Sequence, residues 1–293
     1  MTPQEELDRA IIHQSYLLRR SNGMAADQER ALEDLEDYIV AAIVLAKPDS
    51  LKAKSYSKLL VDVRKKIASV STDITESLRE DLNDLGDYEY KYNSGVVEST
   101  DTLSTPINGV TYDDSMTAFE AATIATVVQQ LNIGVGGGES ISEIVERVTG
   151  FGIKPRKNAL RSFIKTAATH VTNEAKQQWW GVSGVDEWLF VAVLDSRTTF
   201  TCANLSGTHY PVGTGPRPPR HRNCRSTTMP YYAGLDVNLS YEPWLKTQSA
   251  TIQREMLGAT RYEVWKAGKI SLSGFVDDAG RKLTLDELKL KDS

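Results

Sequence analysis

The residues of this chain that are best suited to chemistry gather in the segment 195–226. Both cysteines of the protein, Cys202 and Cys224, lie in this segment, together with two of its four histidines, His209 and His221. The segment contains five arginines and one aspartate and so carries a formal charge of +4, whereas the whole chain carries −5. A basic segment with metal-binding and nucleophilic side chains, in an otherwise acidic chain, is the first place to look for a functional site.

The spacing of Cys202, His221 and Cys224 offers three ligands that zinc accepts. Zinc normally has four such ligands, or three and a water molecule, so Asp195, His209 or solvent would complete the site. Two other interpretations stay open: a Cys202–Cys224 disulfide, and a packed turn with two reduced thiols. Because the Pro/Gly-rich loop between the cysteines returns the chain to the same place, we predict that Cys202 and Cys224 lie close together.

The same residue types would also suit nucleophilic catalysis, with the Cys202 thiolate paired to the imidazole of His221 or His209. Nothing in the sequence makes these residues neighbours, and the residues around Cys202 match no nucleophile signature. Two carboxylates at the spacing of an acid/base pair are also absent from the sequence. We therefore expect the chain to have no catalytic residues and not to be an enzyme.

Three polar residues at the start of the segment are expected to hold a turn. Asp195 and Arg197 follow an apolar run and are two residues apart, which would place them on the same face of a strand. Their side chains can form charge-assisted hydrogen bonds, and Thr198 can cap the turn. We expect Asp195, Arg197 and His221 to have a structural role.

The Pro/Gly-rich loop carries most of the positive charge of the segment. Four arginines occur within nine residues and alternate with prolines: Arg217, Arg220, Arg222 and Arg225. So short a loop is not expected to give all four a buried partner, and we predict that they form a contact surface for a protein or for DNA phosphates. The alternative is a solvated loop whose charges aid solubility.

Length and composition describe an ordinary globular chain. With 293 residues, 40% of them hydrophobic and 25% charged, the chain can bury a sizeable core. No stretch approaches the roughly 20 apolar residues of a membrane-spanning helix, and the first residues do not resemble a secretory signal. Two cysteines are too few for a disulfide scaffold and indicate a chain made in a reducing cytoplasm. The net charge of −5 argues against a free-standing DNA-binding protein.

Helical periodicity dominates the first 95 residues. Apolar residues recur there at three- and four-residue steps: Leu32, Leu35, Ile39, Ala42, then Leu60, Val63, Ile67, Val70, Ile74, Leu78, Leu82, Leu85 and Tyr92. Pro48 separates the two series. The pattern predicts long helices in a bundle or a helical arm, with an extended coiled coil as the alternative.

Loop and turn signals follow. Residues 93–115 predict a long loop or a short hairpin that turns at Asn108-Gly109. A helix is expected over 116–131, and the glycines of 134–138 indicate a flexible hinge. Ser140 and Glu143 have the spacing of a capping box for a short helix.

A small mixed region is expected after residue 150. The sequence Gly-Phe-Gly at 150–152 should end the preceding helix, and Pro155 suits the first turn of a new one that contains His170 as a packed core residue. The apolar run that starts at Glu187 predicts a buried strand, which the segment 227–232 can pair with. A last helix is expected over 243–257. The sequence therefore predicts an α-rich α+β fold, with an N-terminal helical bundle or arm and a small C-terminal α+β module.

The motif of the segment resembles a phage family. The pattern D-x-R-T-x-x-x-C-x-x-L-x-G-x-x-Y, a Pro-rich loop and H-x-x-C-R resemble the C-terminal module of phage Mu F-like and SPP1 gp7-like head morphogenesis proteins. The matching residues are Asp195, Arg197, Thr198, Cys202, Leu205, Gly207, Tyr210, Pro219, His221, Cys224 and Arg225. The upstream residues Arg161, Thr166, Asn173 and Trp188 are also similar. Departures are Arg222 and Ser226, where many relatives have proline and cysteine, and a threonine at a further cysteine position.

The resemblance implies a minor capsid protein of a tailed-phage head. Such a protein is assembled in the host cytoplasm, is located in the virion, and associates with the portal or the major capsid protein near packaged DNA. It would act in head assembly, DNA packaging or DNA delivery. On this basis the chain divides into a helical region (1–150), a Mu F-like module (151–240) and a C-terminal helix and tail (241–293). The alternatives are an enzyme or toxin-type module related to ADP-ribosyltransferases, and a DNA-binding protein.

Overall fold

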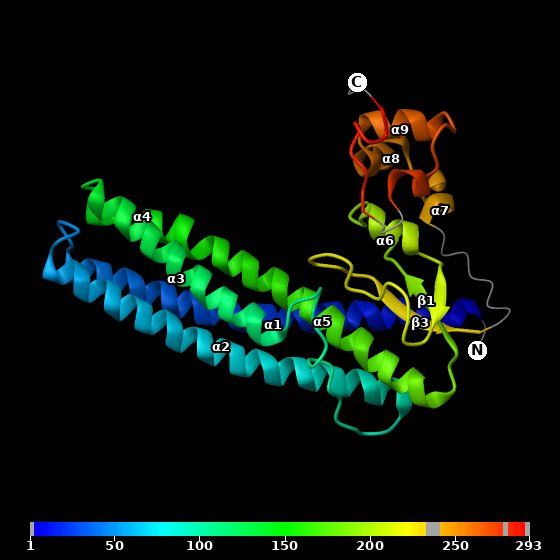
Figure 1. The fold of residues 1–293 in the computed structure, drawn as a ribbon, viewed down its shortest axis with the longest axis horizontal. Helices are drawn as coiled ribbons and strands as arrows, with labels where there is room; N and C mark the ends of the chain where they lie inside the picture. Colours follow the sequence, from blue (N-terminus) through cyan, green and yellow to red (C-terminus); the bar gives the residue numbers. More distant parts are fainter. Residues whose placement is uncertain (1–2, 233–240, 278–280, 291–293) are drawn as a thin grey trace.

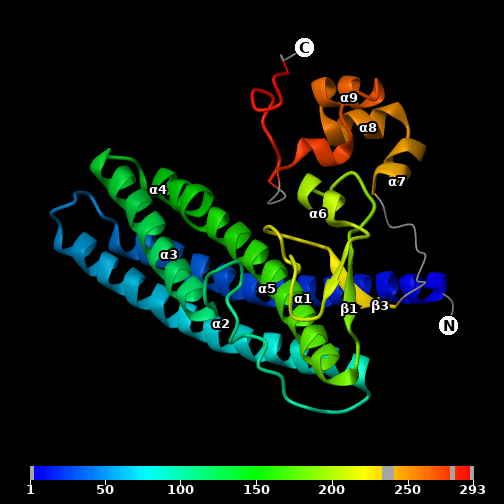
Figure 2. The same ribbon diagram turned by 45° about the vertical axis from the view of Figure 1, so that its right-hand side comes forward.

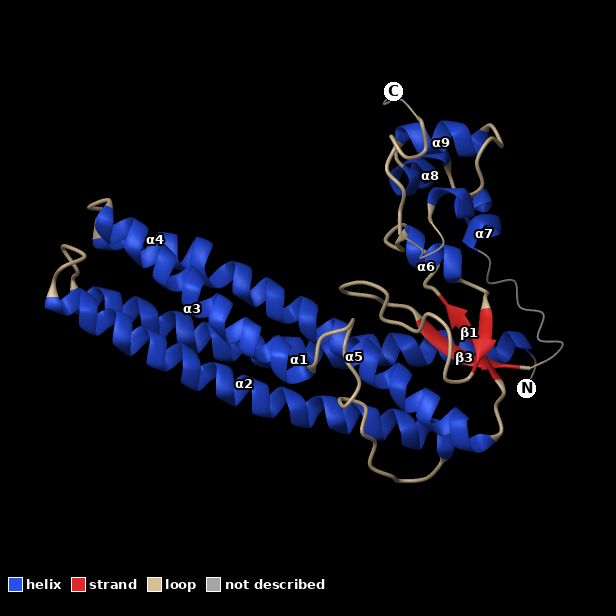
Figure 3. Cartoon of the chain, viewed as in Figure 1, coloured by secondary structure: helices blue, strands red, loops and turns tan. Residues whose placement is uncertain are grey.

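The protein is an elongated helical bundle that carries a small sheet and a group of short helices at one end (Figures 1 and 2). The computed structural model describes residues 3–232, 241–277 and 281–290. Helices make up most of this chain, as the colouring by secondary structure shows (Figure 3). The predicted α-rich α+β class is therefore confirmed.

Four long helices form the bundle: α1 (Pro3–Ala46), α2 (Lys54–Ser94), α3 (Tyr112–Gly136) and α5 (Lys154–Ser183). The apolar stripes predicted from the sequence face its interior, where Ile39, Ile67 and Leu82 are fully buried. Each such side chain contributes about 1.5–3 kcal/mol of transfer free energy. Since α1 and α2 both pack against α5, the bundle interpretation is confirmed and the extended coiled coil is wrong.

The bundle core is continuous from Leu17 in α1 to Val171 in α5. It therefore extends across residue 150, the expected end of the helical region. The loop between α2 and α3 contains the predicted hairpin turn, because Ile107 and Val110 pair across Asn108-Gly109. Both turn residues have positive φ, which is the conformation that asparagine and glycine tolerate best.

Helix α3 is longer than the sequence predicted. It starts at Tyr112 because the Thr111 side chain caps it by accepting a hydrogen bond from the backbone N–H of Asp114. It continues to Gly136, so the turn lies at residues 137–138 and not over the whole glycine run. A Cβ atom at residue 134 would lie 2.9 Å from Ile144, so glycine here permits the close approach of α4 (Ile141–Arg147).

The predicted helix break at 150–152 is wrong. The predicted capping box of Ser140 and Glu143 starts α4, which runs into the π-helix η1 (Val148–Ile153) and then directly into α5. At the junction the Lys154 N–H donates to the Thr149 carbonyl in the five-residue pattern of a π-helix, and Pro155, which has no N–H, follows in the first turn of α5.

A three-stranded antiparallel sheet follows α5. It has the order β2-β1-β3, with β1 (Glu187–Val191) in the centre, β2 (His209–Pro211) and β3 (Thr227–Tyr231). The predicted pairing of β1 with the segment after residue 226 is confirmed, with Trp188 opposite Pro230. The strand ends earlier than expected, so Asp195 lies in the turn after it. Strand β2 was not predicted because three residues carry no periodicity.

The two faces of the sheet are both covered. On one face Leu189 and Met229 pack against Leu7 of α1. On the other face Trp188 and Phe190 pack with both cysteines and with Trp180 at the end of α5. The sheet therefore attaches the cysteine-bearing segment to the bundle.

The C-terminal region consists of short helices: α6 (Phe200–Leu205), α7 (Tyr241–Thr247), α8 (Ala250–Leu257), α9 (Ala259–Lys266) and the 3₁₀-helix η2 (Leu272–Phe275). The single helix expected over 243–257 is wrong, because the Ser249 side chain accepts a hydrogen bond from Ile252 N–H and starts a new helix. Phe200 of α6 shares a core with Tyr241 and Phe275, so the tail packs on the motif. Residues 233–240 of the expected 151–240 module lie outside the described chain. In the described segments, no helix has the length and hydrophobicity needed to cross a bilayer.

Candidate functional site

The structure brings together the three predicted ligands of the motif. Cys202 comes from α6, whereas His221 and Cys224 come from the loop before β3. The Cys202 Sγ lies 3.7 Å from Cys224 Sγ and 3.2 Å from His221 Nε2. The predicted proximity of the two cysteines is confirmed, and the Cys202–His221 contact is one that the sequence could not show.

Of the three interpretations of this cluster, the disulfide does not agree with the structure. Cys202 and Cys224 are free thiols, and their separation of 3.7 Å greatly exceeds an S–S bond of about 2.05 Å. A metal site and a packed turn with reduced thiols remain. Both cysteines are nearly inaccessible, at 2% and 1% exposure.

The cluster fits a zinc ion in two respects. Its three ligand atoms lie within 4.8 Å of one another, which is close enough for one ion. The His221 Nδ1 is 2.8 Å from the carbonyl oxygen of Arg222, so a proton on Nδ1 leaves Nε2 unprotonated and directed at the thiols. A hydrogen bond of this kind orients the imidazole of most metal-bound histidines.

Neither Asp195 nor His209, the two side chains considered as a fourth ligand, joins the cluster. Asp195 is bound to Arg225, and His209 lies 3.3 Å from Glu187 and stacks on Tyr231. In the part of the chain that the structure describes, no other Cys, His, Asp or Glu joins the cluster. Zinc would therefore be held by three protein ligands and one external ligand, an arrangement that zinc accepts.

The members of the cluster shift one another's pKa values in opposite directions. The hydrogen bond with Cys224 and burial both raise the pKa of Cys202. The hydrogen bond from Cys202 lowers the pKa of Cys224, and His221 lowers it further, whereas the hydrogen bond with Cys224 raises the pKa of His221. These hydrogen bonds favour ionisation of Cys224 over ionisation of Cys202, and both sulfurs are nearly inaccessible.

The predicted turn at Asp195 exists, but the main partner of the Asp195 carboxylate is Arg225 and not Arg197. Both oxygens of Asp195 accept hydrogen bonds from Arg225, each at 2.6 Å. The Arg197 side chain is 76% exposed, and its guanidinium lies 3.5 Å from the Asp195 carboxylate. The backbone N–H of Arg197 makes the closer contact, a hydrogen bond of 3.0 Å to the same carboxylate. Thr198 caps the turn as predicted, since its hydroxyl donates to the carbonyl of Val193. The hydrogen bonds from Arg225 lower the pKa of Asp195.

Tyr241 is a motif contact that the sequence did not reveal. Its hydroxyl donates to the backbone carbonyl of Asp195, and its ring is 1% exposed. Burial raises the pKa of Tyr241, so the hydroxyl keeps the proton that this bond requires. A separation of 46 residues carries no signal of such a contact.

Polar side chains on one face of α5 form hydrogen bonds with the loop before β3 and with β3 itself. Thr169 Oγ1 donates to the Cys224 carbonyl at 2.8 Å, and Thr166 Oγ1 accepts from the backbone N–H of Asn223 at 3.0 Å. Asn173 Oδ1 accepts from the hydroxyl of Thr228 at 2.8 Å. Three- and four-residue steps between these polar residues, in a buried helix, are a signal that sequence reasoning could have used.

The other motif residues maintain the packing around the cluster. Leu205 packs with the two cysteines, and the ring centroids of Tyr210 and Trp188 lie 5.2 Å apart. Gly207 has φ of 83°, a conformation that glycine adopts without strain, and its N–H donates to the Phe190 carbonyl. Each of these residues serves the local fold.

Two of the four loop arginines that were predicted to form a contact surface have acidic partners within the protein. Arg217 binds the carboxylate of Glu174 at 3.0 Å, and Arg225 binds Asp195. The helix α5 and the turn after β1 supply these acidic partners, which lie far from the loop in sequence. Arg220 and Arg222 remain exposed.

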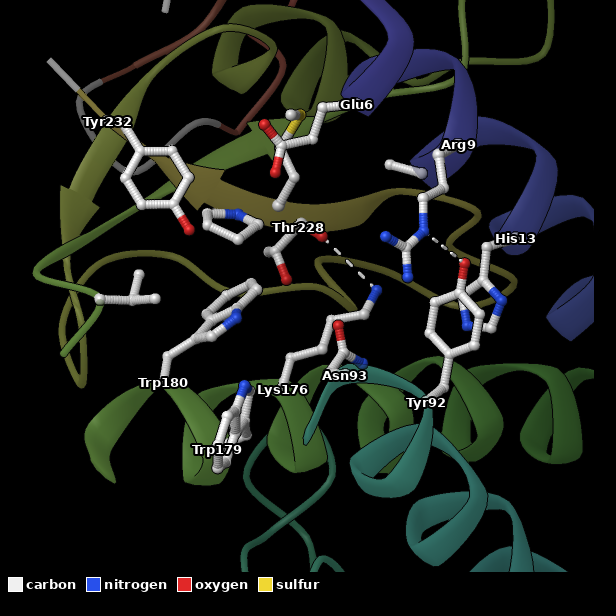
Figure 4. A pocket seen from close by; sticks show the side chains of 14 residues that line it. Glu6, Arg9, His13, Tyr92, Asn93, Lys176, Trp179, Trp180, Thr228 and Tyr232 are labelled. Carbon is white, nitrogen blue, oxygen red and sulfur yellow. Dashed lines mark hydrogen bonds between the residues drawn. The ribbon is translucent and has the colours of Figure 1, made fainter. Parts of the chain in front are cut away.

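A second polar cluster joins the sheet to the bundle. Figure 4 shows Lys176 and His13 beside a small pocket of about 210 Å³. Glu89, which is fully buried, lies 2.6 Å from His13 Nε2 and 3.5 Å from Lys176 Nζ, and Lys176 donates to Thr227 Oγ1 at 2.6 Å. Although burial opposes it, Lys176 and His13 lower the pKa of Glu89, whereas burial lowers that of Lys176. This cluster could not be predicted from the sequence, because its members come from four separate elements.

Comparisons with protein-family models, with curated proteins and with solved structures found no match to this chain. The likeness to phage head proteins therefore depends on the residues of the motif.

Proposed function

We propose that this chain is a minor capsid protein of a tailed-phage head, bound near the portal and acting in head assembly, DNA packaging or DNA delivery. The observation that supports the proposal is that the residues of the resemblance contact one another as a single unit. Asp195 with Arg225 and Cys202 with His221 and Cys224 connect the turn after β1, helix α6 and the loop before β3. A motif used in this way stabilises a fold, which suits a structural component.

The elongated bundle suits the same role. Its long helices offer an extended surface to a partner, and the sheet and short helices stand at one end of it (Figure 1). Portal and major capsid proteins are the partners that this proposal names. Zinc, if the virion protein carries it, would be held by Cys202, His221 and Cys224 and would fix α6 to the loop.

An enzymatic role is the alternative that one observation favours, the 3.2 Å contact of Cys202 with His221. A nucleophilic cysteine needs a depressed pKa and access to substrate. Cys202 is 2% exposed and its pKa is raised, so we propose that the contact is structural.

Binding to the portal tests the proposal. The purified chain is mixed with the portal ring encoded by the same phage, and the mixture is separated by size-exclusion chromatography. We expect the chain to elute with the ring and to elute alone when a portal ring from an unrelated phage replaces it. Separate elution from the cognate ring, at low and at physiological salt, would reject the proposed association.

A further inference from the structure

A cleft beside the motif has an unusual charge. It lies between α1, α5 and the loop before β3, has a volume of about 570 Å³, and none of its lining residues is acidic. Five lining residues are cationic: Arg161, Lys165, Arg197, Arg222 and Arg225. They come from α5, from the turn after β1 and from the loop, so only the folded chain brings them together.

Two of these cations are neutralised within the protein. Arg161 binds Glu29 of α1 through two hydrogen bonds, and Arg225 binds Asp195. Their carboxylate partners hold them in place at the edge of the cleft. These two pairs contribute to its shape more than to its net charge.

The other three cations give the cleft an excess of positive charge. No ion pair joins Lys165 or Arg222 to an acidic side chain of the described segments, and Arg197 makes only the 3.5 Å contact to Asp195. Like charges gathered in one cleft repel one another unless an anion neutralises them. The excess positive charge of the cleft therefore favours binding of an anionic ligand, although the whole chain is acidic.

The neutral lining residues indicate which anion fits. Asparagine and serine side chains surround the cations, among them Asn22, Asn158 and Ser162, and no phenylalanine, tyrosine or tryptophan lines the cleft. Contacts to the sugar-phosphate backbone use this set of arginine, lysine, amide and hydroxyl groups. A protein partner would need aromatic or apolar anchors at the centre of its interface, and stacking of a base would need an aromatic surface.

We propose that this cleft binds the phosphate backbone of a nucleic acid without sequence preference, through Lys165, Arg197 and Arg222. The site differs from the arginine loop expected from the sequence, because Arg217 and Arg225 are used internally and α5 provides a cation that the loop pattern did not include. The inference depends on the cleft and not on the proposed role in a phage head. Its test uses the purified chain alone, so the two proposals can fail separately.

The test is fluorescence anisotropy with a short labelled DNA duplex in a salt titration. The Lys165→Gln/Arg222→Gln double variant removes two cleft charges. The control Lys65→Gln/Lys266→Gln removes two exposed charges that do not line the cleft. Circular dichroism and the melting temperature first establish that both variants fold like the wild type, and Arg197→Gln provides a single-site version of the same test.

We expect the wild type to bind the duplex with an affinity that falls steeply between about 50 and 200 mM salt. The cleft variant should bind about tenfold more weakly at low salt, and its salt slope should be lower by roughly two units, one per lost phosphate contact. The control variant should bind like the wild type. Equal weakening in both variants, or no binding by the wild type, would overturn the inference. Equally tight binding of polyglutamate would overturn it in favour of an acidic protein partner.

Discussion

Arg225 binds both carboxylate oxygens of Asp195 across 30 residues of sequence, and each of the two hydrogen bonds measures 2.6 Å. The pair joins the loop before β3 to the turn after β1, and the Tyr241 hydroxyl bonds the backbone of the same turn. Asp195 thus connects the sheet and the cysteine loop through its carboxylate, and the C-terminal helices through its backbone carbonyl. The structural interpretation of the motif depends most on this residue.

Asp195→Asn is expected to destabilise the protein. The substitution keeps the shape of the side chain but removes its charge and leaves part-buried Arg225 without a counterion. We expect a loss of about 1–3 kcal/mol in the free energy of unfolding, measured by urea denaturation. Asp49→Asn, at an exposed position in the α1–α2 connection, is the matched control and should change stability little. Equal stability of the two variants would mean that the pair does not hold the fold.

The contribution of Asp195 should depend on pH. Because Arg225 lowers its pKa in the folded state, the pair stabilises the protein above the unfolded-state pKa of about 3.9. This stabilisation is lost as the pH falls through the lower folded-state pKa. The difference in stability between wild type and Asp195→Asn should therefore be largest near neutral pH and smaller towards pH 3. A difference that stays constant over this range would contradict the assigned pair.

The bundle and the central strand were predictable from the sequence because their signals are local. Ile39, Ile67 and Leu82 recur with the period of a helix, and Trp188 and Phe190 belong to a short apolar run. The capping box of α4 was also visible, since Ser140 and Glu143 form it within a single turn.

The contacts around the motif were not predictable, because they join residues far apart in sequence. Nothing local pairs Arg225 with Asp195, or shows that Glu174 of α5 neutralises Arg217. The cleft could not be predicted for the same reason, because Lys165 of α5 and Arg222 are far apart in sequence and lie near each other only in the folded chain. The proximity of the two cysteines was predictable because one loop connects them.

Zinc is expected to stabilise the wild-type protein through the Cys–His cluster. An ion that binds only the folded state raises the melting temperature as its concentration increases. The Cys202→Ser/Cys224→Ser variant, which lacks two of the three ligands, should show no such rise, and magnesium should have no effect on either protein. If zinc leaves the melting temperature of the wild type unchanged, the cluster is a packed turn with two reduced thiols.

Lys176→Met should be strongly destabilising, because it leaves Glu89 buried without its lysine partner. Removal of one member of a buried ion pair costs about 3–5 kcal/mol. The double variant Glu89→Gln/Lys176→Met should recover part of this loss, since it leaves no unpaired charge. A double-mutant cycle measured by urea denaturation gives the coupling energy, and additive effects of the two substitutions would show that the residues act independently.

The location of the protein tests the central claim most directly. Heads of the phage proposed as the source of this chain are purified, washed at high salt, and analysed by quantitative mass spectrometry together with tails and with heads from a deletion mutant. We predict that the chain remains in wild-type heads at far fewer copies than the major capsid protein, and that it is absent from isolated tails. A chain produced during infection but missing from the washed heads would contradict its assignment as a minor capsid protein.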